Sequence, residues 1–309
     1  MEKTYELIII GSGAAGLTAG IYAGRALIDT AIIEKLPVSG GQIVKTHEID
    51  NYPGLPRISG IDLGIKLREH SEQFDLEFIT GEVIKFQVKD GIKEQTREDG
   101  QKYYSKTVLI ATGADPRKLG VKGEEELQGM GVSYCATCDG AFFRNQVVAI
   151  VGGGDVAVED SLFLARLCEK VYLIHRRDEF RAIKSYVEKM KATPNIEMVL
   201  DSQVEEIIGE DQVEKVIVKN KKTNERKELK VNAVFVAIGN IPNSKVYQAS
   251  VDVDEGGYIV ADEDGKTNIP GVFAAGDIRT KELRQIITAA SDGANVVTTV
   301  EKYLNSLES

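Results

Sequence analysis

The 309-residue chain contains only three cysteines and three histidines, and both shortages limit its chemistry. An odd number of cysteines with one close pair is not the disulfide framework of a small secreted protein. Three scattered histidines leave few soft ligands for a metal, so we expect no metal site. The N-terminus also lacks the apolar stretch of a signal peptide. We therefore expect a reducing compartment, the cytoplasm.

Basic residues and long apolar runs are scarce as well. There are 38 Lys and Arg against 48 Asp and Glu, a net charge of −10, which disfavours nucleic acid as a partner because such binding depends on cationic contacts with phosphates. No apolar run approaches the length of a membrane span, so we expect no membrane partner. The composition, 42% apolar and 28% charged, is typical of a globular chain, and its length fits roughly two domains.

A glycine motif near the N-terminus is the first positive signal. Residues 5–10 are an apolar run typical of a buried parallel strand, and residues 11–16 read Gly-Ser-Gly-Ala-Ala-Gly before a predicted helix. Such glycines permit a tight turn, close approach of the backbone to a pyrophosphate, and packing of helix on strand. Glu34 ends the next predicted strand, where its carboxylate can accept hydrogen bonds from ribose hydroxyls. The segment predicts a dinucleotide-binding unit.

The same pattern returns in the middle of the chain. Residues 147–151 form a second apolar run, and residues 152–157 read Gly-Gly-Gly-Asp-Val-Ala. A shift of 141 residues places Gly11 on Gly152. A repeat of this length indicates a duplicated domain, so the predicted fold class is α/β with two Rossmann-like dinucleotide-binding domains.

Both units also end alike, with strands at residues 107–113 and 233–239 that finish in glycine. We expect boundaries near residues 115–120 and 240–244, where prolines follow these strands. The remaining tail, with a terminal helix from about residue 283, has no counterpart in the middle unit.

The second motif differs from the first in its charged neighbours. His175 stands where Glu34 stands in the first unit, and Arg176, Arg177 and Arg181 follow. A carboxylate would repel a 2′-phosphate, whereas arginine pairs with phosphate oxygens in a bidentate fashion. The cluster predicts that this unit prefers NADPH to NADH, although a solvated charged helix start remains an alternative.

A second basic run is simpler to interpret. It lies between apolar stretches and is typical of a solvated hairpin; its members are Lys219, Lys221, Lys222, Arg226, Lys227 and Lys230.

The pair Cys135 and Cys138 is the third signal. A C-x-x-C spacing fits either half of a zinc site or a redox dithiol. The chain offers too few further zinc ligands to complete a four-ligand site, so the redox dithiol is favoured. A dithiol accepts two electrons, as dinucleotide cofactors supply them, and Asp139 offers a proton donor to a leaving thiolate. The alternative for Asp139 is a turn or helix cap. Cys168 falls in an apolar helix and is expected to be a core thiol.

These motifs together resemble one family, the low-molecular-weight, bacterial-type thioredoxin reductases. The resemblance covers nearly the whole chain, and its carriers are Gly11-Ser12-Gly13-Ala14-Ala15-Gly16, Gly40-Gly41-Gln42, Cys135-Ala136-Thr137-Cys138-Asp139-Gly140, Gly152-Gly153-Gly154-Asp155-Val156-Ala157, His175-Arg176-Arg177-Asp178 with Arg181, and Gly276-Asp277 with Arg284-Gln285.

The resemblance implies FAD in the first unit and NADPH in the second, which is inserted into the first. The implied domains are residues 1–115 with 245–309 for FAD, and 116–244 for NADPH and the dithiol. The expected FAD contacts are Gly11, Ser12, Gly13, Ala14, Gly16, Glu34, Lys35, Gly40, Gly41, Gln42, Asn51, Val83, Ala111, Thr112, Gly113, Asp277, Arg284, Gln285 and Ile286. The expected NADPH contacts are Gly152, Gly153, Gly154, Asp155, Val156, Ala157, His175, Arg176, Arg177, Arg181, Ile238 and Gly239.

The resemblance also implies a mechanism. Hydride passes from NADPH to FAD, electrons pass through Cys138 to the disulfide, and Cys135 attacks thioredoxin with Asp139 as acid or base. A homodimer and a rotation between the two domains are further implications. Two alternatives stay open within this scaffold, a related flavoprotein that uses ferredoxin and a small-molecule dithiol oxidase. A nucleotide-sensing protein without catalysis is a third, against which the intact dithiol argues.

Overall fold

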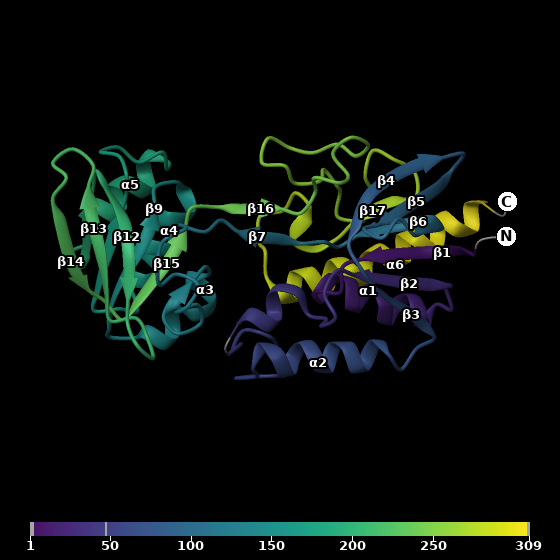
Figure 1. Ribbon diagram of the computed structural model, residues 1–309, viewed down its shortest axis with the longest axis horizontal. Helices are drawn as coiled ribbons and strands as arrows, with labels where there is room; N and C mark the ends of the chain where they lie inside the picture. The colour runs from purple at the N-terminus through teal and green to yellow at the C-terminus, as the bar shows by residue number, and fades with distance from the viewer. Residues whose placement is uncertain (1–2, 47, 308–309) are drawn as a thin grey trace. The chain divides into compact units, whose positions relative to one another are not determined.

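The computed structural model describes residues 3–46 and 48–307, and it divides into two compact units (Figure 1). The first unit comprises Met1–Asp115 and Ile241–Ser309, and the second comprises Pro116–Asn240. The bounds expected from the sequence were 116 and 244 for the second unit, within boundary ranges of 115–120 and 240–244. Where the chain leaves and returns, β7 (Ala114–Pro116) and β16 (Asn240–Pro242) pair as a two-stranded sheet.

The first unit is built on a seven-stranded sheet in the order β3-β2-β1-β6-β5-β4, with β17 paired to β6. Strands β3, β2, β1, β6 and β17 are parallel neighbours, and β5 is antiparallel to both β6 and β4. The strands are β1 (Thr4–Ile10), β2 (Thr30–Glu34), β3 (Leu76–Thr80), β4 (Val83–Lys89), β5 (Ile92–Arg97), β6 (Lys102–Ile110) and β17 (Val272–Ala274). The helical segments are α1 (Ala14–Arg25), η1 (Gly41–Lys45), α2 (Gly60–Ser71), η3 (Gly276–Ile278) and α6 (Ile286–Leu307).

The core of the first unit explains why β1 reads as a continuous apolar run. Leu7, Ile8 and Ile9 are fully buried, because both faces of this central parallel strand are covered. On one face α1 and α6 lie side by side (Figure 1). They pack closely at Gly293, where a Cβ atom would stand 2.2 Å from the Ala15 carbonyl oxygen. The C-terminal helix thus completes the core that the N-terminal strand begins.

The second unit repeats this arrangement with a parallel sheet in the order β11-β10-β9-β15-β8. Its strands are β8 (Val132–Ser133), β9 (Val147–Gly152), β10 (Lys170–Ile174), β11 (Ile196–Val199) and β15 (Ala233–Ala237). Its helical segments are α3 (Ala136–Asp139), η2 (Gly140–Phe143), α4 (Asp155–Ala165) and α5 (Lys184–Lys191). In each unit the glycine motif follows a central strand that lies between the next strand of the chain and a much later one, β1 between β2 and β6 and β9 between β10 and β15. This reversal of the strand order is the switch point where such folds bind ligands. The predicted α/β fold class is confirmed.

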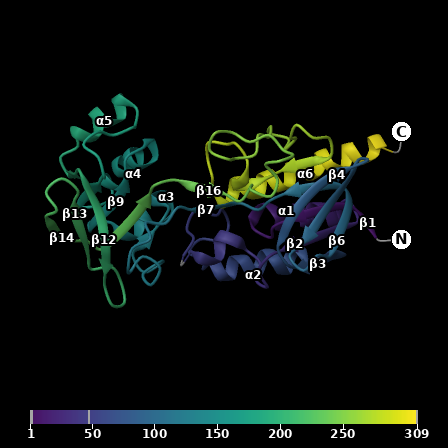
Figure 2. The same cartoon turned by 45° about the horizontal axis from the view of Figure 1, so that its top comes forward.

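A separate antiparallel sheet joins β11 to β15 in the chain, and its three strands lie side by side in Figures 1 and 2. It contains β12 (Ser202–Ile208), β13 (Lys215–Asn220) and β14 (Arg226–Lys230). The predicted basic hairpin is therefore β13–β14. In the residues that the structure describes, no helix combines the length and the apolar character needed to cross a membrane.

Candidate active site

The first glycine motif forms a turn that only small residues allow. Gly11 has a φ of +103°, and a Cβ atom on it would stand 2.4 Å from the Ala111 carbonyl oxygen at the end of β6. A Cβ atom on Gly16 would stand 1.9 Å from the Gly11 carbonyl oxygen. Beside Gly13, in contrast, no atom lies within 4 Å of the Cβ position. The first and third glycines are thus packing requirements, and the second faces open space that a pyrophosphate could occupy.

A second turn packs onto this motif. The Gly40 N–H donates to the Ser12 carbonyl oxygen at 2.8 Å, and the Cβ position of Gly41 is 3.4 Å from the Cα of Gly13. Gln42, at the start of η1, donates a side-chain hydrogen bond to the Ala114 carbonyl oxygen at 3.3 Å. Glu34 accepts hydrogen bonds from the Ser12 N–H at 2.7 Å and from the Ser12 hydroxyl at 2.8 Å. Two segments that the sequence analysis named separately therefore meet at one edge of the sheet.

The C-terminal tail brings further predicted residues to the first unit. The Asn51 side-chain amide donates to the Gln285 side-chain oxygen at 3.0 Å, across 234 positions of the sequence. Asp277 lies in η3, and its Oδ1 atom is buried without a hydrogen-bond partner. Burial raises the pKa of this carboxyl group. The Nε atom of Arg284 is likewise buried and unpaired, while its guanidinium lies 3.9 Å from the centre of the Tyr258 ring.

These unpaired atoms fit a polar cofactor. A buried acceptor and a buried donor without partners are costly unless a ligand or water pairs them. Asp277 Oδ1 can accept from a hydroxyl group such as those of the FAD ribitol, and the open space beside Gly13 can admit a pyrophosphate. The residues present therefore fit FAD.

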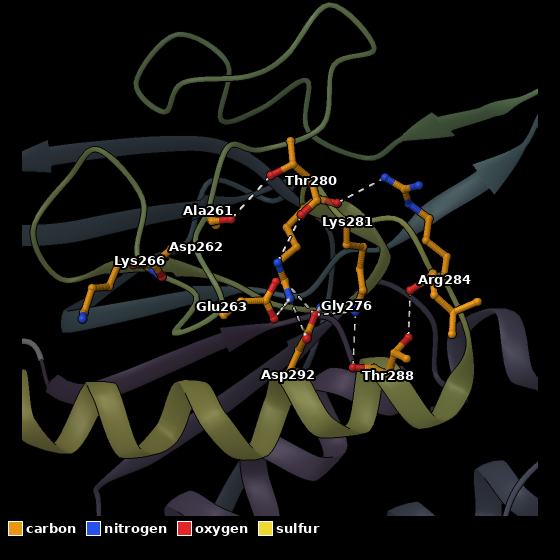
Figure 3. Close-up of polar contacts among 12 residues, drawn as sticks. Ala261, Asp262, Glu263, Lys266, Gly276, Thr280, Lys281, Arg284, Thr288 and Asp292 are labelled. Atoms are coloured by element: carbon orange, nitrogen blue, oxygen red, sulfur yellow. Dashed lines mark hydrogen bonds and ion pairs between the residues drawn. The ribbon is translucent and has the colours of Figure 1, made fainter. Parts of the chain in front are cut away.

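A buried charge cluster, which the sequence analysis missed, holds η3 in place (Figure 3). Asp292, from α6, receives two hydrogen bonds from Arg279, at 2.8 and 2.9 Å, and one from Lys281 at 2.9 Å. Its Oδ2 atom also accepts the Gly276 N–H at 2.9 Å. The three side chains are each at most 8% exposed. Asp292 thereby fixes the residue immediately before Asp277.

The second glycine motif repeats the close packing of the first. A Cβ atom on Gly152 would stand 2.4 Å from the Ala237 carbonyl oxygen, at the end of β15. Nothing lies within 4 Å of the Cβ position of Gly154. Asp155, at the start of α4, accepts a hydrogen bond from the Ile183 N–H at 2.8 Å, and Val156 is 61% exposed. The open position beside Gly154 is again the one that a pyrophosphate would need.

His175 is a packing residue in this structure. Its ring is buried against Gly153, where a Cβ atom would stand 2.0 Å from the ring, and it stacks on Phe180 at 5.2 Å. Burial, together with the neighbouring arginines, lowers the pKa of His175. His175 follows a strand of the second unit as Glu34 ends a strand of the first, but its imidazole is buried inside the fold.

The arginines that follow line a cavity of about 400 Å³. The backbone N–H of Arg181 donates to the Gly153 carbonyl oxygen at 2.8 Å, which connects this residue to the glycine motif. Arg176, Arg177 and Arg181 are exposed at the surface of the cavity. Three guanidinium groups beside a glycine turn suit an anion, because each offers several donors in a rigid plane. The residues therefore fit the phosphorylated ribose of NADPH.

Cys135 and Cys138 form a disulfide across the four-residue helix α3. Cys135 precedes the helix, and the Cys138 N–H donates to the Cys135 carbonyl oxygen at 3.3 Å. Both cysteines are half-buried, so the pair is within reach of another molecule. Its Cα atoms are 5.3 Å apart, within the range that a disulfide allows.

Ser133 connects this disulfide to Asp139. Its hydroxyl donates to Asp139 Oδ2 at 2.6 Å and accepts the Cys135 N–H at 3.1 Å. Ser133 was not predicted from the sequence, although its position two residues before the dithiol can be read there. The hydroxyl therefore links the Asp139 carboxylate to the backbone of Cys135.

Cys168 is 5% exposed in an apolar cluster, and burial raises the pKa of its thiol to about 11. Such a thiol is a poor nucleophile at neutral pH. In the described ranges, 3–46 and 48–307, no group of three or more His, Cys, Asp or Glu side chains could hold a metal ion. His47, one possible ligand, lies outside the described residues.

The remaining predicted residues lie at the starts or just after the ends of helices and strands. Ala111, Thr112 and Gly113 follow β6 directly, and the Thr112 hydroxyl donates to the Asn243 carbonyl oxygen at 3.0 Å. In the second unit, Ile238 and Gly239 follow β15 in the same way. Four more complete the set at the starts or ends of elements: Ala14 begins α1, Lys35 follows β2, Val83 begins β4 and Ile286 begins α6.

A comparison with known families now places the chain. The model of the pyridine nucleotide-disulphide oxidoreductases matches residues 5–293. The chain belongs to this family. Family membership confirms the predicted class, an oxidoreductase that uses FAD and NADPH.

Within the family, the chain is similar to bacterial thioredoxin reductases. It is 46% identical over 313 residues to the thioredoxin reductase of Peptoclostridium acidaminophilum, with 99% of each chain covered. The crystal structure of thioredoxin reductase from Streptococcus pyogenes matches with a TM-score of 0.95 at 44% identity, over 99% of this chain and 100% of that one. The crystal structure of Lactococcus lactis thioredoxin reductase in its FR conformation matches with a TM-score of 0.68 at 40% identity, over 98% of this chain and 100% of that one. The resemblance predicted from the motifs is confirmed.

Proposed function

We propose that this protein is an NADPH-dependent thioredoxin-disulfide reductase. The observation that carries the proposal is the Cys135–Cys138 disulfide, placed beside the Ser133–Asp139 hydrogen bond in a chain with two dinucleotide-type glycine turns. The full-length similarity to thioredoxin reductases supports it. No feature of the described residues favours ferredoxin or a small-molecule oxidant as the partner over this route.

The first unit is proposed to hold FAD. Gly11, Gly13 and Gly16 form the turn that admits the pyrophosphate, and Glu34 ends the strand where ribose hydroxyls would lie. Asp277 would accept a hydrogen bond from a ribitol hydroxyl, and the Asn51–Gln285 pair and Arg284 would contribute to the same site. FAD, when bound, takes two electrons from NADPH and supplies them to the dithiol.

The second unit is proposed to hold NADPH. Gly152, Gly154 and Ala157 form its turn, and Arg176, Arg177 and Arg181 pair with the 2′-phosphate. Substitution of Arg176 and Arg177 by alanine is expected to raise the KM for NADPH and to leave the KM for NADH nearly unchanged. Equal losses for both coenzymes would contradict the assignment.

The dithiol carries out the exchange with thioredoxin. In the reduced protein, the Cys135 thiolate attacks one sulfur of the thioredoxin disulfide, which forms a mixed disulfide and releases one thioredoxin thiolate. Cys138 then attacks the Cys135 sulfur, which restores the Cys135–Cys138 disulfide and releases the second thioredoxin thiolate. Asp139, held by Ser133, delivers the proton that a released thiolate needs. One disulfide is reduced and one is formed, so the electrons balance.

A movement of the two units belongs to this proposal, because one dithiol serves both an internal cofactor and an external protein. Two solved relatives of nearly equal identity, 44% and 40%, match with TM-scores of 0.95 and 0.68, which supports more than one arrangement in this class of protein. A homodimer and a cytoplasmic location complete the proposal. A cross-link between the two units that left turnover unchanged would exclude the movement.

Anaerobic titration of the yellow protein with NADPH tests the function. We expect the flavin absorbance to bleach and a subsequently added oxidised thioredoxin to be reduced. In Cys135→Ser and Cys138→Ser, bleaching should persist and thioredoxin reduction should vanish. Bleaching without thioredoxin turnover would favour another disulfide substrate, and the absence of bleaching would exclude NADPH as the donor.

A further inference from the structure

The cavity beside the arginines contains residues that the coenzyme motif does not include. Its lining comes from two segments, residues 176–181 and the turn of the β13–β14 hairpin with Asp201. The hairpin contributes Lys221 and Lys222, which lie 40 or more positions after the arginines in sequence. A basic turn of this kind is ordinarily only a solvated surface. Here it faces the same cavity as Arg176, Arg177 and Arg181.

Backbone hydrogen bonds fix the turn in this position. The Asp201 N–H donates to the Arg177 carbonyl oxygen at 3.1 Å, and the Lys221 N–H donates to the Asp201 carbonyl oxygen at 2.6 Å. The side chain of Asn220 accepts the N–H groups of Lys222 and Thr223, at 2.9 and 3.0 Å. The backbone of Asp201 therefore bridges the hairpin turn and the arginine segment.

The charges in the cavity are mixed: three carboxylates line it, those of Asp178, Glu179 and Asp201, and Lys222 stands between the first and the last. Its Nζ atom lies 2.8 Å from Asp178 Oδ2 and 3.0 Å from Asp201 Oδ2. The hydrogen bond from Lys222 lowers the pKa of Asp178, so both partners are charged at neutral pH. Two unscreened carboxylates beside a phosphate would repel it, since like charges at this range oppose binding. Lys221 makes no ion pair with any described residue, and its ammonium is exposed.

We propose that the β13–β14 turn determines coenzyme specificity together with the arginines: Lys222 neutralises Asp178 and Asp201, and Lys221 adds a cation for the 2′-phosphate of NADPH. Without Lys222, the cavity keeps its arginines, but the carboxylates of Asp178 and Asp201 lose their cationic partner and face the incoming dianion. The preference for a 2′-phosphate then falls, while contacts with the rest of the coenzyme are unaffected. This inference rests on the proposed NADPH site of the second unit.

Calorimetric titration of the full-length protein with two probes tests the inference. Adenosine 2′,5′-bisphosphate carries the 2′-phosphate, and adenosine 5′-monophosphate lacks it. Lys222→Gln and Lys221→Gln should each weaken bisphosphate binding by about three- to tenfold at low salt and leave monophosphate binding unchanged. Lys227→Gln is the matched control, because Lys227 lies on β14, pairs with Glu197 at 3.4 Å and does not line the cavity.

A double-mutant cycle separates neutralisation from direct contact. If Lys222 acts by neutralising Asp178, the loss caused by Lys222→Gln should be smaller in an Asp178→Asn background. An equal loss in both backgrounds, or a loss shared by both probes, would overturn this role of Lys222.

Arg176→Gln distinguishes failure of this inference from failure of the proposed function. If Arg176→Gln weakens bisphosphate binding and neither lysine variant does, the inference is wrong and the NADPH site stands. If none of the three variants weakens it, the proposed NADPH site is wrong as well.

Discussion

The buried cluster around Asp292 allows a sharp prediction. Asp292→Ala would leave the guanidinium of Arg279 and the ammonium of Lys281 without their buried partner, at 3% and 8% side-chain exposure. Removal of one member of a buried ion pair typically costs about 3–5 kcal/mol, because the other charge stays desolvated. We expect a loss of this size in the free energy of unfolding of the first unit.

The substitution should also weaken FAD binding. Asp292 accepts the Gly276 N–H, and Gly276 precedes Asp277, whose unpaired carboxylate oxygen is proposed to meet the cofactor. Loss of this charged acceptor releases the turn, and we expect about a tenfold weaker FAD affinity. Urea titration followed by circular dichroism measures the stability. Titration of the apoprotein with FAD, followed by flavin fluorescence, measures the cofactor affinity.

Glu263→Ala is the matched control. Glu263 pairs with the same Arg279 at 3.3 Å, but its side chain is 90% exposed, so its removal should cost at most about 1 kcal/mol. Burial alone would raise the pKa of Asp292, but the hydrogen bonds from Arg279 and Lys281 hold this pKa below its ordinary value. The difference between wild type and Asp292→Asn should therefore persist at neutral pH and shrink as the pH falls below about 4. Equal effects of Asp292→Ala and Glu263→Ala would refute the reasoning.

Three further predictions concern other parts of the molecule. Ser133→Ala frees Asp139 from a 2.6 Å hydrogen bond and should lower thioredoxin turnover about tenfold and alter its pH profile, while NADPH-driven bleaching is unchanged; Ser133→Thr should restore turnover, and an unaltered pH profile would contradict the role. Gly16→Ala places a Cβ atom 1.9 Å from a backbone oxygen and should cost more than about 2 kcal/mol in urea unfolding, whereas Gly13→Ala, which meets open space, should keep stability and lose FAD affinity; similar stabilities would exclude this distinction. Burial lowers the pKa of Lys93, which is 1% exposed, to about 8, so between about pH 8 and 10 the unfolded chain binds this proton more readily than the folded one. The free energy of unfolding should therefore rise with pH in this range, and Lys93→Met should abolish the rise. An identical pH dependence in both proteins would disprove it.

The parts of the fold that could be predicted from the sequence are those set by local chemistry. A glycine that must adopt a φ of +103° beside a carbonyl leaves a mark in the sequence, and Gly11 was found in this way. The dithiol needs only four consecutive positions, so it was equally visible. The Asp292–Arg279 cluster carries no such mark, because its partners meet only after a helix packs on a distant turn.

The start of the terminal helix was predicted too early. The expected start near residue 283 is wrong, since α6 begins at Ile286. The Thr288 hydroxyl accepts the Gln285 N–H at 3.1 Å and donates to the Leu283 carbonyl oxygen at 3.0 Å. The Thr288 side chain thus pairs with the backbone just before the helix, and residues 283–285 lie outside it. Helical periodicity alone cannot reveal a side chain that sets the start of a helix in this way.

The position of α6 and β17 at the far end of the chain has a consequence for biosynthesis. As the polypeptide leaves the ribosome, β1, α1 and β6 are made first, but β17 and α6, which complete their sheet and cover their apolar face, are made last. The whole second unit is translated in between. The nascent first unit must therefore wait with Leu7, Ile9 and Leu109 uncovered, whereas the second unit is complete in itself and can fold at once. Any premature stop within the last helix should thus leave a protein with one folded unit and one that is exposed to chaperones and proteases.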